Sequence, residues 1–343
     1  MKHTLTLLLA TLLAVTSFAQ VKKAPAPERQ VWNEIGEDYE YPPLYGDVES
    51  VVYTSYELKD YFGEIVKGDL DEKAVFKFNK RGDAIEKARY NSDGSLREKH
   101  TWKYDSAGNK IEEAGYDSDG SLYWKSIYKY DSAGNKIEGA SYNSDGSLDR
   151  KYISKYDSAG NRIEDAEYAS DGSLYGKRIY KYDSAGNVIE EAEYNSDGSL
   201  WYKKIYKYDS AGNMIEEVGY NSDGTQKWKY ISKYDSAGNK IEEAEYNSDG
   251  SLDEKYTWKY DSAGNMIERV RYNSDGWLDE KYTWKYDSAG NMIEKASYDS
   301  DGSLRDKGIY KYDSKGNVVE VIWYETDIMI PQYIEEYKIT YRK

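Results

Sequence analysis

The feature that most constrains the fold of this chain is a strict repeat of 26 residues. The segment Tyr-Asp-Ser-Ala-Gly-Asn that begins at Tyr104 returns at this interval, and Tyr312 begins the last, slightly altered copy. A diverged copy begins one period earlier at Phe78. No insertion interrupts the spacing, so the period reflects a structural register in which each unit contacts mainly its neighbours. We therefore expect ten repeats over residues 78–324 rather than a domain with one central core.

Each repeat carries two turn signals. With the Tyr of Tyr-Asp as offset 0, Asp-Ser-Ala-Gly-Asn occupies offsets 1–5 and Asn-Ser-Asp-Gly-Ser occupies offsets 13–17. Such residues bond to their own backbone or, as Gly does, adopt positive φ without strain. The seven or eight residues between turns suit a strand and are too few for packed helices. The chain is therefore predicted to be all-β, a repetitive antiparallel β-hairpin meander with two strands per repeat. The predicted structural turn glycines are Gly108, Gly120, Gly134, Gly146, Gly160, Gly172, Gly186, Gly198, Gly212, Gly224, Gly238, Gly250, Gly264, Gly276, Gly290 and Gly302.

The register of the hairpins can be predicted from the loop length. With five-residue loops, offsets that sum to 30 lie opposite each other, which pairs Glu113 with Lys125 and Tyr116 with Leu122. This register places offsets 0, 10, 12, 18, 22 and 24, mostly Tyr, Trp, Leu and Ala, on one face. Offsets 7, 9, 21, 23 and 25, where Ile stands among Glu and Lys, form the other face. Because sheets twist, we expect a coiled or spiralling extended sheet, with a flat sheet wetted on both faces as the alternative.

The two ends of the chain differ from the repeats. Residues 1–19 have a basic start, an apolar run and Ser-Phe-Ala before Gln20, which predicts a signal peptide; an uncleaved anchor is the alternative. Residues 20–46 hold four of the five prolines and are predicted to be a disordered leader. Residues 47–77 are predicted to be N-terminal capping strands and residues 325–343 a C-terminal capping strand. The protein is thus expected to be exported, to the periplasm, the cell surface or the medium, without a membrane span after signal removal.

Composition excludes several functions. The net charge of −16 argues against nucleic acid and anionic membranes as partners. There is no Cys, and the two histidines are His3, within the predicted signal, and His100, so cysteine catalysis and histidine-based triads or metal clusters are excluded. Nearly all carboxylates stand at repeating offsets, where no copy is unique. We therefore predict that the protein is not an enzyme and has no cofactor.

Two turn motifs are similar to a metal-binding motif and a modification motif, although turn formation alone also explains their residues. Asp-Ser-Asp-Gly, at Asp117 and Asp299, is similar to the start of a calcium loop, but the distal Glu of such a loop is replaced by Tyr, Ser or Trp. No metal site is therefore predicted. Asp-Ser-Ala recurs in eight turns from Asp105 to Asp287 and is similar to the acceptor of a general O-glycosylation system in some Gram-negative bacteria. Glycosylation of these serines remains an alternative to a purely structural turn.

The aromatic positions give the strongest candidate for a binding surface. Flat rings at offsets 24 and 0 would stand in rows along one face, where they could stack against sugar rings or protein side chains. The alternative is that these rings form the core of the coil, with each Tyr hydroxyl at its edge. The candidate ligand-binding residues are Trp102, Tyr104, Tyr128, Tyr130, Tyr206, Tyr208, Trp258, Tyr260, Trp284 and Tyr286.

The repeat motif, followed by Tyr at offset 12 and Gly at offset 16, resembles the YD-repeat or Rhs-repeat family, whose motif is Tyr-Asp-x-x-Gly-Asn/Arg. The resemblance covers residues 78–324. It implies strings of β-hairpins that wind into a curved or spiralling sheet on secreted and surface bacterial proteins. Roles in toxin encapsulation, adhesion and carbohydrate contact are also implied. Ten repeats are few for a closed shell, so we expect an open coil or strip.

These observations predict an exported, non-catalytic β-repeat protein for binding or adhesion. Its partner would be a glycan or an envelope or surface protein, held against the aromatic face. One alternative is a structural spacer or envelope component with no small ligand. Another is a toxin-associated, Rhs-like shell fragment. The sequence does not define an oligomeric state.

Overall fold

The computed structural model describes residues 44–325 and 330–343, which form one antiparallel sheet of 22 strands. In this part of the chain, no helix is long and apolar enough to cross a membrane. The predicted signal peptide and most of the predicted leader lie outside the described residues. The strands are β1 (Val48–Tyr61), β2 (Glu64–Phe78), β3 (Ala84–Tyr90), β4 (Leu96–Tyr104), β5 (Lys110–Asp117), β6 (Leu122–Tyr130), β7 (Lys136–Asn143), β8 (Leu148–Tyr156), β9 (Arg162–Ala169), β10 (Leu174–Tyr182), β11 (Val188–Asn195), β12 (Leu200–Tyr208), β13 (Met214–Asn221), β14 (Gln226–Tyr234), β15 (Lys240–Asn247), β16 (Leu252–Tyr260), β17 (Met266–Tyr272), β18 (Leu278–Tyr286), β19 (Met292–Tyr298), β20 (Leu304–Tyr312), β21 (Val318–Glu325) and β22 (Ile330–Tyr341).

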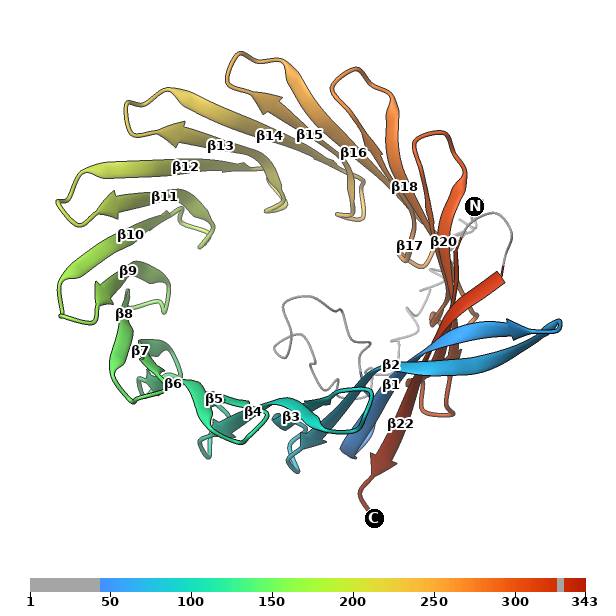
Figure 1. The fold of residues 1–343 in the computed structure, drawn as a ribbon. Coiled ribbons are helices and arrows are strands. Elements are labelled where there is room, and N and C mark those ends of the chain that lie inside the picture. The colour runs from blue at the N-terminus through green and yellow to red at the C-terminus, as the bar shows by residue number, and fades with distance from the viewer. Residues whose placement is uncertain (1–43, 326–329) are drawn as a thin grey trace, which may run out of the picture.

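The sheet is closed on itself. Each strand pairs with its neighbour in sequence, and β1 pairs with both β2 and β22, so the two ends of the meander join in a barrel (Figure 1). The prediction of a coiled or spiralling open sheet is therefore wrong, whereas the prediction of an all-β hairpin meander is confirmed. Closure removes the two free edges that an open strip would expose to other chains. With 22 strands about 4.8 Å apart, the backbone ring is at least about 34 Å across.

The hydrophobic core sits at the closing seam. Val51, Phe76 and Val321 are fully buried there, and the rings of Tyr53 and Tyr337 pack 5.2 Å apart between β1 and β22. The segments predicted to cap open ends, residues 47–77 and 325–343, thus supply the strands that pair with each other. Residues 44–46, placed in the predicted leader, are described, and Leu44 is buried in this core.

The turns follow the chemistry of their residues. Asp105 accepts hydrogen bonds from the backbone N–H groups of Ala107 and Asn109, each at 2.9 Å, and the side chain of Asn109 donates to it as well. In the other turn, Asp119 accepts a bond of 2.9 Å from the N–H of Ser121. All sixteen predicted turn glycines have φ between 80° and 99°, a conformation that strains residues with a β-carbon.

A β-bulge beside each turn changes the predicted register. Tyr116 does pair with Leu122, but Gly115 pairs with Trp124, so Tyr123 is an extra residue on β6. The predicted pair of Glu113 with Lys125 is therefore wrong, and Glu113 lies opposite Ser126. One extra residue shifts every following pair by one position, which moves side chains between faces. In the structure, offsets 0, 9, 11, 20, 22 and 24 share one face, and offsets 8, 10, 12, 18, 21, 23 and 25 share the other.

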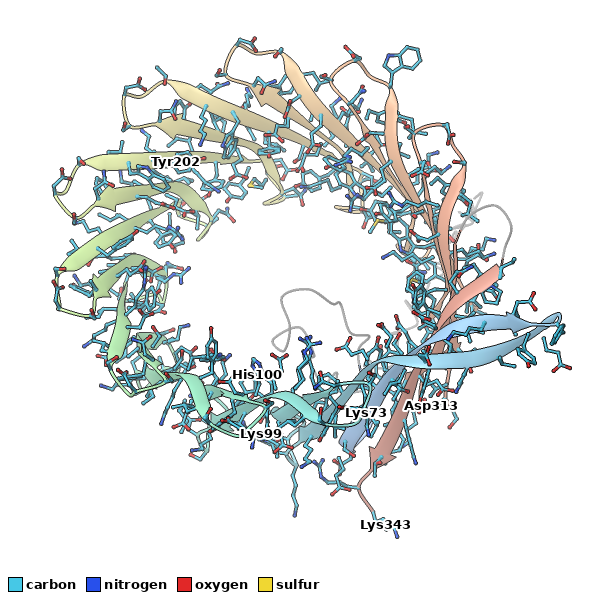
Figure 2. All side chains as sticks on the ribbon, viewed as in Figure 1. Lys73, Lys99, His100, Tyr202, Asp313 and Lys343 are labelled. Carbon is cyan, nitrogen blue, oxygen red and sulfur yellow. The ribbon has the colours of Figure 1, made fainter. Side chains whose placement is uncertain are left out.

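The first of these faces lines the barrel. Figure 2 shows His100, at offset 22, on the inner side of β4, and its neighbour Lys99, at offset 21, on the outer side. Because side chains alternate along a strand, the same parity holds for each repeat. Among the described residues, strands pack against their neighbours in the ring and not across it. We call the two surfaces the inner face and the outer face.

The outer face is a ladder of ion pairs. Glu112, at offset 8, lies between Lys103 and Lys125, with N···O distances of 2.8 and 3.0 Å. Glu216 and Glu242 are flanked in the same way by lysines from the neighbouring strands. The pKa of each of these carboxyls is lowered by hydrogen bonds to its lysines. A network of this kind holds adjacent hairpins together more effectively than isolated surface pairs would.

The ladder predicts a loss of stability in acid. A carboxyl with a lowered pKa stabilises the fold above its unfolded pKa of about 4.3, and this contribution is lost as the pH falls through the lower pKa of the folded state. We expect the thermal unfolding midpoint to drop steeply below about pH 4. Circular dichroism melts should show a shallower drop for the triple variant Glu112→Gln, Glu216→Gln, Glu242→Gln. Equal acid slopes for parent and variant would contradict the assignment.

Closure predicts that strands can be removed only in pairs. Deleting Tyr182–Lys207 removes one repeat and leaves 20 strands, so β1 and β22 still meet antiparallel. Deleting only Tyr182–Tyr194 leaves 21 strands, and the two closing strands would then have to run parallel. We expect one cooperative melt for the first variant, and a much lower midpoint or no cooperative melt for the second. Similar melts for both deletions would contradict a closed ring.

Candidate ligand-binding site

Differences between the repeats concentrate on the inner face. On the outer face, offset 8 is always Glu, offset 12 is always Tyr, and offsets 21 and 25 are always Lys. On the inner face, offset 9 changes among Lys, Glu, Gly, Asp, Arg and Val, and offset 20 among Glu, Trp, Arg, Gly, Tyr and Asp. Both faces belong to the same strands and the same hydrogen-bonded ladder. The fold therefore fixes the outer side chains and leaves the inner ones to differ from hairpin to hairpin.

Five of the predicted ligand residues stand in the inner row at offset 24. Trp102 is 6% exposed and belongs to the seam core, whereas the other four are half-buried. Trp258 stacks on Tyr256 with ring centroids 5.9 Å apart. The next hairpin repeats this pair in Trp284 and Tyr282, at 6.0 Å. This row includes Trp102, Tyr128, Tyr206, Trp258 and Trp284.

The tyrosines of this row bond to carboxylates of the preceding strand. The hydroxyl of Tyr128 donates to Glu113 at 2.6 Å, and that of Tyr206 donates to Glu191 at 3.1 Å. Burial is the largest cause of the raised pKa of both hydroxyls, and the neighbouring carboxylates raise it further. These hydroxyls therefore stay protonated and hold the carboxylates on the inner face.

The other five predicted ligand residues form a structural row at offset 0. The hydroxyl of Tyr208 donates to the backbone carbonyl of Val188 at 2.8 Å, twenty residues earlier. The same bond to the preceding repeat is made by Tyr104, Tyr130, Tyr260 and Tyr286. The bond explains why Tyr occupies offset 0 in nine of the ten repeats, since Phe cannot make it. These rings are on the inner face, but their hydroxyls already bind the chain.

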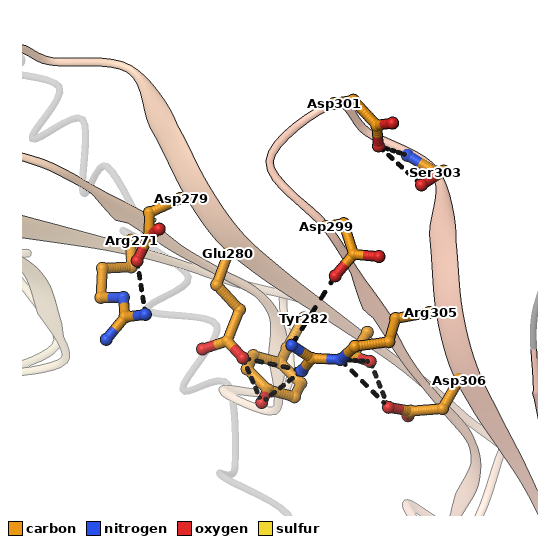
Figure 3. A network of polar contacts seen from close by, with 10 residues as sticks. Arg271, Asp279, Glu280, Tyr282, Asp299, Asp301, Ser303, Arg305 and Asp306 are labelled. Carbon is orange, nitrogen blue, oxygen red and sulfur yellow. Dashed lines mark hydrogen bonds and ion pairs between the residues drawn. The ribbon is translucent and has the colours of Figure 1, made fainter.

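Charged side chains of the inner face are joined in short networks. Arg178 reaches Glu191 at 2.8 Å and Glu193 at 2.6 Å, both on β11. On the far side of the barrel, Arg305 bonds to Glu280 at 2.7 Å and to the hydroxyl of Tyr282 at 3.1 Å (Figure 3). Because Arg305 lies on β20 and Glu280 on β18, this contact crosses the strand between them. Such networks fix the orientation of the inner side chains.

A positive charge is buried beside the seam. Lys87 is 4% exposed, and its ammonium group lies 5.6 Å from the centre of the Phe76 ring. Burial lowers the pKa of Lys87 to about 8. On the opposite side of the seam, burial raises the pKa of Glu335, which accepts hydrogen bonds from Trp323 and Tyr337. These groups belong to the packing of the seam.

Several open hollows lie along the barrel wall. One, of about 940 Å³, extends from β7 to β12 and includes Tyr152, Tyr175 and Trp201; Leu174 and Tyr194 of the outer face also contribute to its lining. A smaller one, of about 390 Å³, lies between β13 and β17 and includes Trp258 and Tyr256. One predicted site residue, Trp258, thus lines the second hollow, whereas the aromatic residues of the first were not among the predicted ones.

The sequence does contain a pattern that distinguishes the aromatic residues of the first hollow. Tyr175 and Trp201 stand at offset 19, the extra residue of the bulge, where other repeats have Arg, Asp, Lys or Tyr. Tyr152 stands at offset 22, which varies similarly. Comparing the repeats position by position would have separated these variable offsets from the constant ones. Aromatic content alone does not separate these variable positions from the constant row at offset 0.

The acidic side chains of the described residues do not gather into a metal-binding cluster. Within 44–325 and 330–343, no group of three or more His, Asp or Glu side chains is placed to hold a metal ion. The carboxylates of the turns are used by the turns, as Asp105 and Asp119 illustrate. Ser106, in the Asp-Ser-Ala turn, is exposed at the rim of the barrel.

Comparisons with known proteins give distant structural neighbours. No protein-family model and no curated protein sequence matches this chain, so the resemblance to YD repeats remains a prediction. A Tc holotoxin pore of Photorhabdus luminescens is 13% identical over 77% of this chain and 19% of its own, with a TM-score of 0.35. A complex of TcdB2 and TccC3 is 13% identical over 80% and 20%, with a TM-score of 0.30. A porin-like protein of Bacteroides uniformis is 10% identical over 85% and 98%, with a TM-score of 0.29. The chain spans about a fifth of the length of the two toxin chains.

The hydroxyl row at offset 0 predicts a difference between two Tyr→Phe substitutions. Tyr208→Phe removes a bond to a backbone carbonyl and should lower the free energy of unfolding by about 1 kcal/mol. Tyr220→Phe is the control, because this ring lies on the outer face beside Lys203. Urea unfolding monitored by fluorescence should show little change for the control. An equal loss for both variants would contradict the structural role of the row.

Proposed function

We propose that this chain is an exported, non-catalytic binding protein that holds a glycan or protein partner against the inner face of its barrel. The observation that carries the proposal is the contrast between a constant outer face and a variable inner face on the same strands. A purely structural ring needs the turns, the hydroxyl row and the outer ladder, but it does not need inner side chains that differ from hairpin to hairpin. Variable side chains on a rigid scaffold are instead the usual basis of ligand recognition.

The chemistry of the inner face also supports binding. It presents half-buried Trp and Tyr rings beside carboxylates and guanidinium groups that are already oriented by hydrogen bonds. Aromatic rings supply contact area at a low cost in conformational entropy, and fixed polar groups supply direction. The structural spacer remains the alternative, because it requires no ligand. The toxin-associated shell fragment also remains a prediction.

The test compares inner and outer aromatic residues of the same two repeats. The full chain should first be screened against glycan and envelope-protein panels. In Trp258→Leu with Trp284→Leu, two flat rings of the inner face are lost while most apolar volume is kept, so affinity for a partner found in the screen should fall at least about tenfold. The matched control, Tyr246→Leu with Tyr272→Leu, changes the outer face and should bind within about twofold of the parent.

Two results would contradict the proposal. One is the absence of any partner in both panels at millimolar ligand, which would favour the structural spacer. The other is a partner whose affinity falls with the outer pair and stays unchanged with the inner pair. Thermal melts of all variants, run alongside, separate loss of binding from loss of fold.

A further inference from the structure

The larger hollow of the inner wall arises because two bulky side chains are missing. Ser154 occupies offset 24, where seven of the nine repeats that reach this position have Trp or Tyr. Gly176 occupies offset 20, between Arg150 and Tyr202 at the same offset of the neighbouring repeats. Both residues line the hollow of about 940 Å³. An added Cβ at Gly176 would lie 3.0 Å from the carbonyl oxygen of Tyr194, so a side chain there would also crowd the wall.

Three aromatic rings border this hollow and are unusually exposed. Tyr152 is 44% exposed, and Tyr175 and Trp201 are each 61% exposed. By contrast, Tyr180 on the same wall is 8% exposed. Tyr175 and Trp201 occupy the same offset on β10 and β12, which are alternate strands of the ring, so their positions are about 10 Å apart across the wall. Tyr152, on β8, lies three residues further along its strand, so the three rings form a staggered group of flat apolar surfaces.

The arginines around the hollow are paired with carboxylates, whereas Lys136 and Lys177, which also line it, lie 4.9 and 5.8 Å from the centres of the Tyr128 and Tyr194 rings. Arg178 is held by Glu191 and Glu193, Arg162 by Asp165 at 3.2 Å, and Arg150 by Glu167. The guanidinium of Arg150 also lies 4.9 Å from the centre of the Tyr175 ring. A strongly charged ligand would compete with these ion pairs for the arginines and carboxylates. A neutral ligand rich in hydroxyl groups can donate to the carboxylates and accept from the guanidinium groups without separating them.

From these observations, we infer that the hollow between β8 and β12 binds a neutral oligosaccharide chain, whose sugar faces stack on Tyr152, Tyr175 and Trp201. This inference rests on the proposed function of the inner face and names its ligand class and its position. The separate positions of the rings on alternate strands suit a polymer that presents flat faces at intervals. The paired charges orient its hydroxyl groups.

The experiment titrates the full chain by calorimetry with hexasaccharide probes of three charge classes. The neutral set is cellohexaose, maltohexaose, laminarihexaose and mannohexaose; the acidic probe is hexagalacturonate, and the cationic probe is chitosan hexamer. We expect at least one neutral probe to bind at least tenfold tighter than the charged ones. Since a neutral ligand has no charge to screen, its affinity should change less than twofold between 50 and 500 mM NaCl.

Matched variants locate the site. Trp201→Ala and Tyr175→Ala should each weaken the neutral probe at least tenfold. Because both side chains are largely exposed, their removal should leave the melting curve unchanged. Tyr123→Ala is the control for Tyr175, since it occupies the same offset and is 64% exposed but lies outside the hollow. Trp277→Ala, at a 73% exposed Trp in a turn, is the control for Trp201. Both controls should bind within twofold of the parent.

The outcomes separate this inference from the broader proposal. If a neutral probe binds but its affinity is unchanged by Trp201→Ala and Tyr175→Ala, the proposed location is wrong. If that binding is lost in the double variant of Trp258 and Trp284, the inner face is still the binding site. Preference for a charged probe, or binding of only a protein from the envelope panel, overturns the ligand class and leaves the proposed function standing. Failure of every glycan and every envelope protein overturns both.

Discussion

The structure depends on the pairing of β1 with β22. This ladder runs from Val48 opposite Tyr341 to Glu57 opposite Tyr333, and it converts a row of hairpins into a ring. An antiparallel meander can close in this way only with an even number of strands, which the two-strand repeat and the two pairs of end strands provide. Closure satisfies backbone groups that an open strip would leave at its edges. It also gives the sheet an inside and an outside, and all further distinctions between the two faces follow from this.

The two faces carry different sets of interactions. On the outside, the Glu at offset 8 pairs with a lysine of an adjacent strand, and in six repeats with lysines of both, as Glu112 does. Most turns are closed by the side chain of their own Asp, as Asp105 illustrates. On the inside, the hydroxyl of each Tyr at offset 0 ties one repeat to the backbone of the preceding one. These interactions recur with the period of the sequence and do not use offsets 9, 11, 19, 20 or 22. The inner positions can therefore change from repeat to repeat without loss of the ladder that holds the ring.

Local features of this fold could be predicted from the sequence, but global ones could not. The turns were accessible because Asp, Asn and Gly have strong local preferences, and strand lengths followed from the spacing between turns. The bulges could not be predicted, because the extra residue Tyr123 differs in no simple way from its neighbours. This bulge places Glu113 on the face opposite to the predicted one. Closure depends on the curvature summed over all strands, to which each residue contributes little. The candidate hollow arises from Ser154 and Gly176, whose importance lies in the side chains that they lack.

The central claim, that the chain closes so that its variable face lies inside, can be tested at the seam. Because the chain has no cysteine, Ser50→Cys with Thr340→Cys introduces one pair of thiols at positions that are Cα partners across β1 and β22. Adjacent strands bring such residues within reach of a disulfide. After mild oxidation, intact-mass spectrometry should find a monomer that is two hydrogens lighter and does not react with alkylating agent. Ser50→Cys with Ser199→Cys, on a distant part of the ring, should remain reduced. If the seam pair also stays reduced, or forms only intermolecular dimers, the chain is an open strip and the account is contradicted.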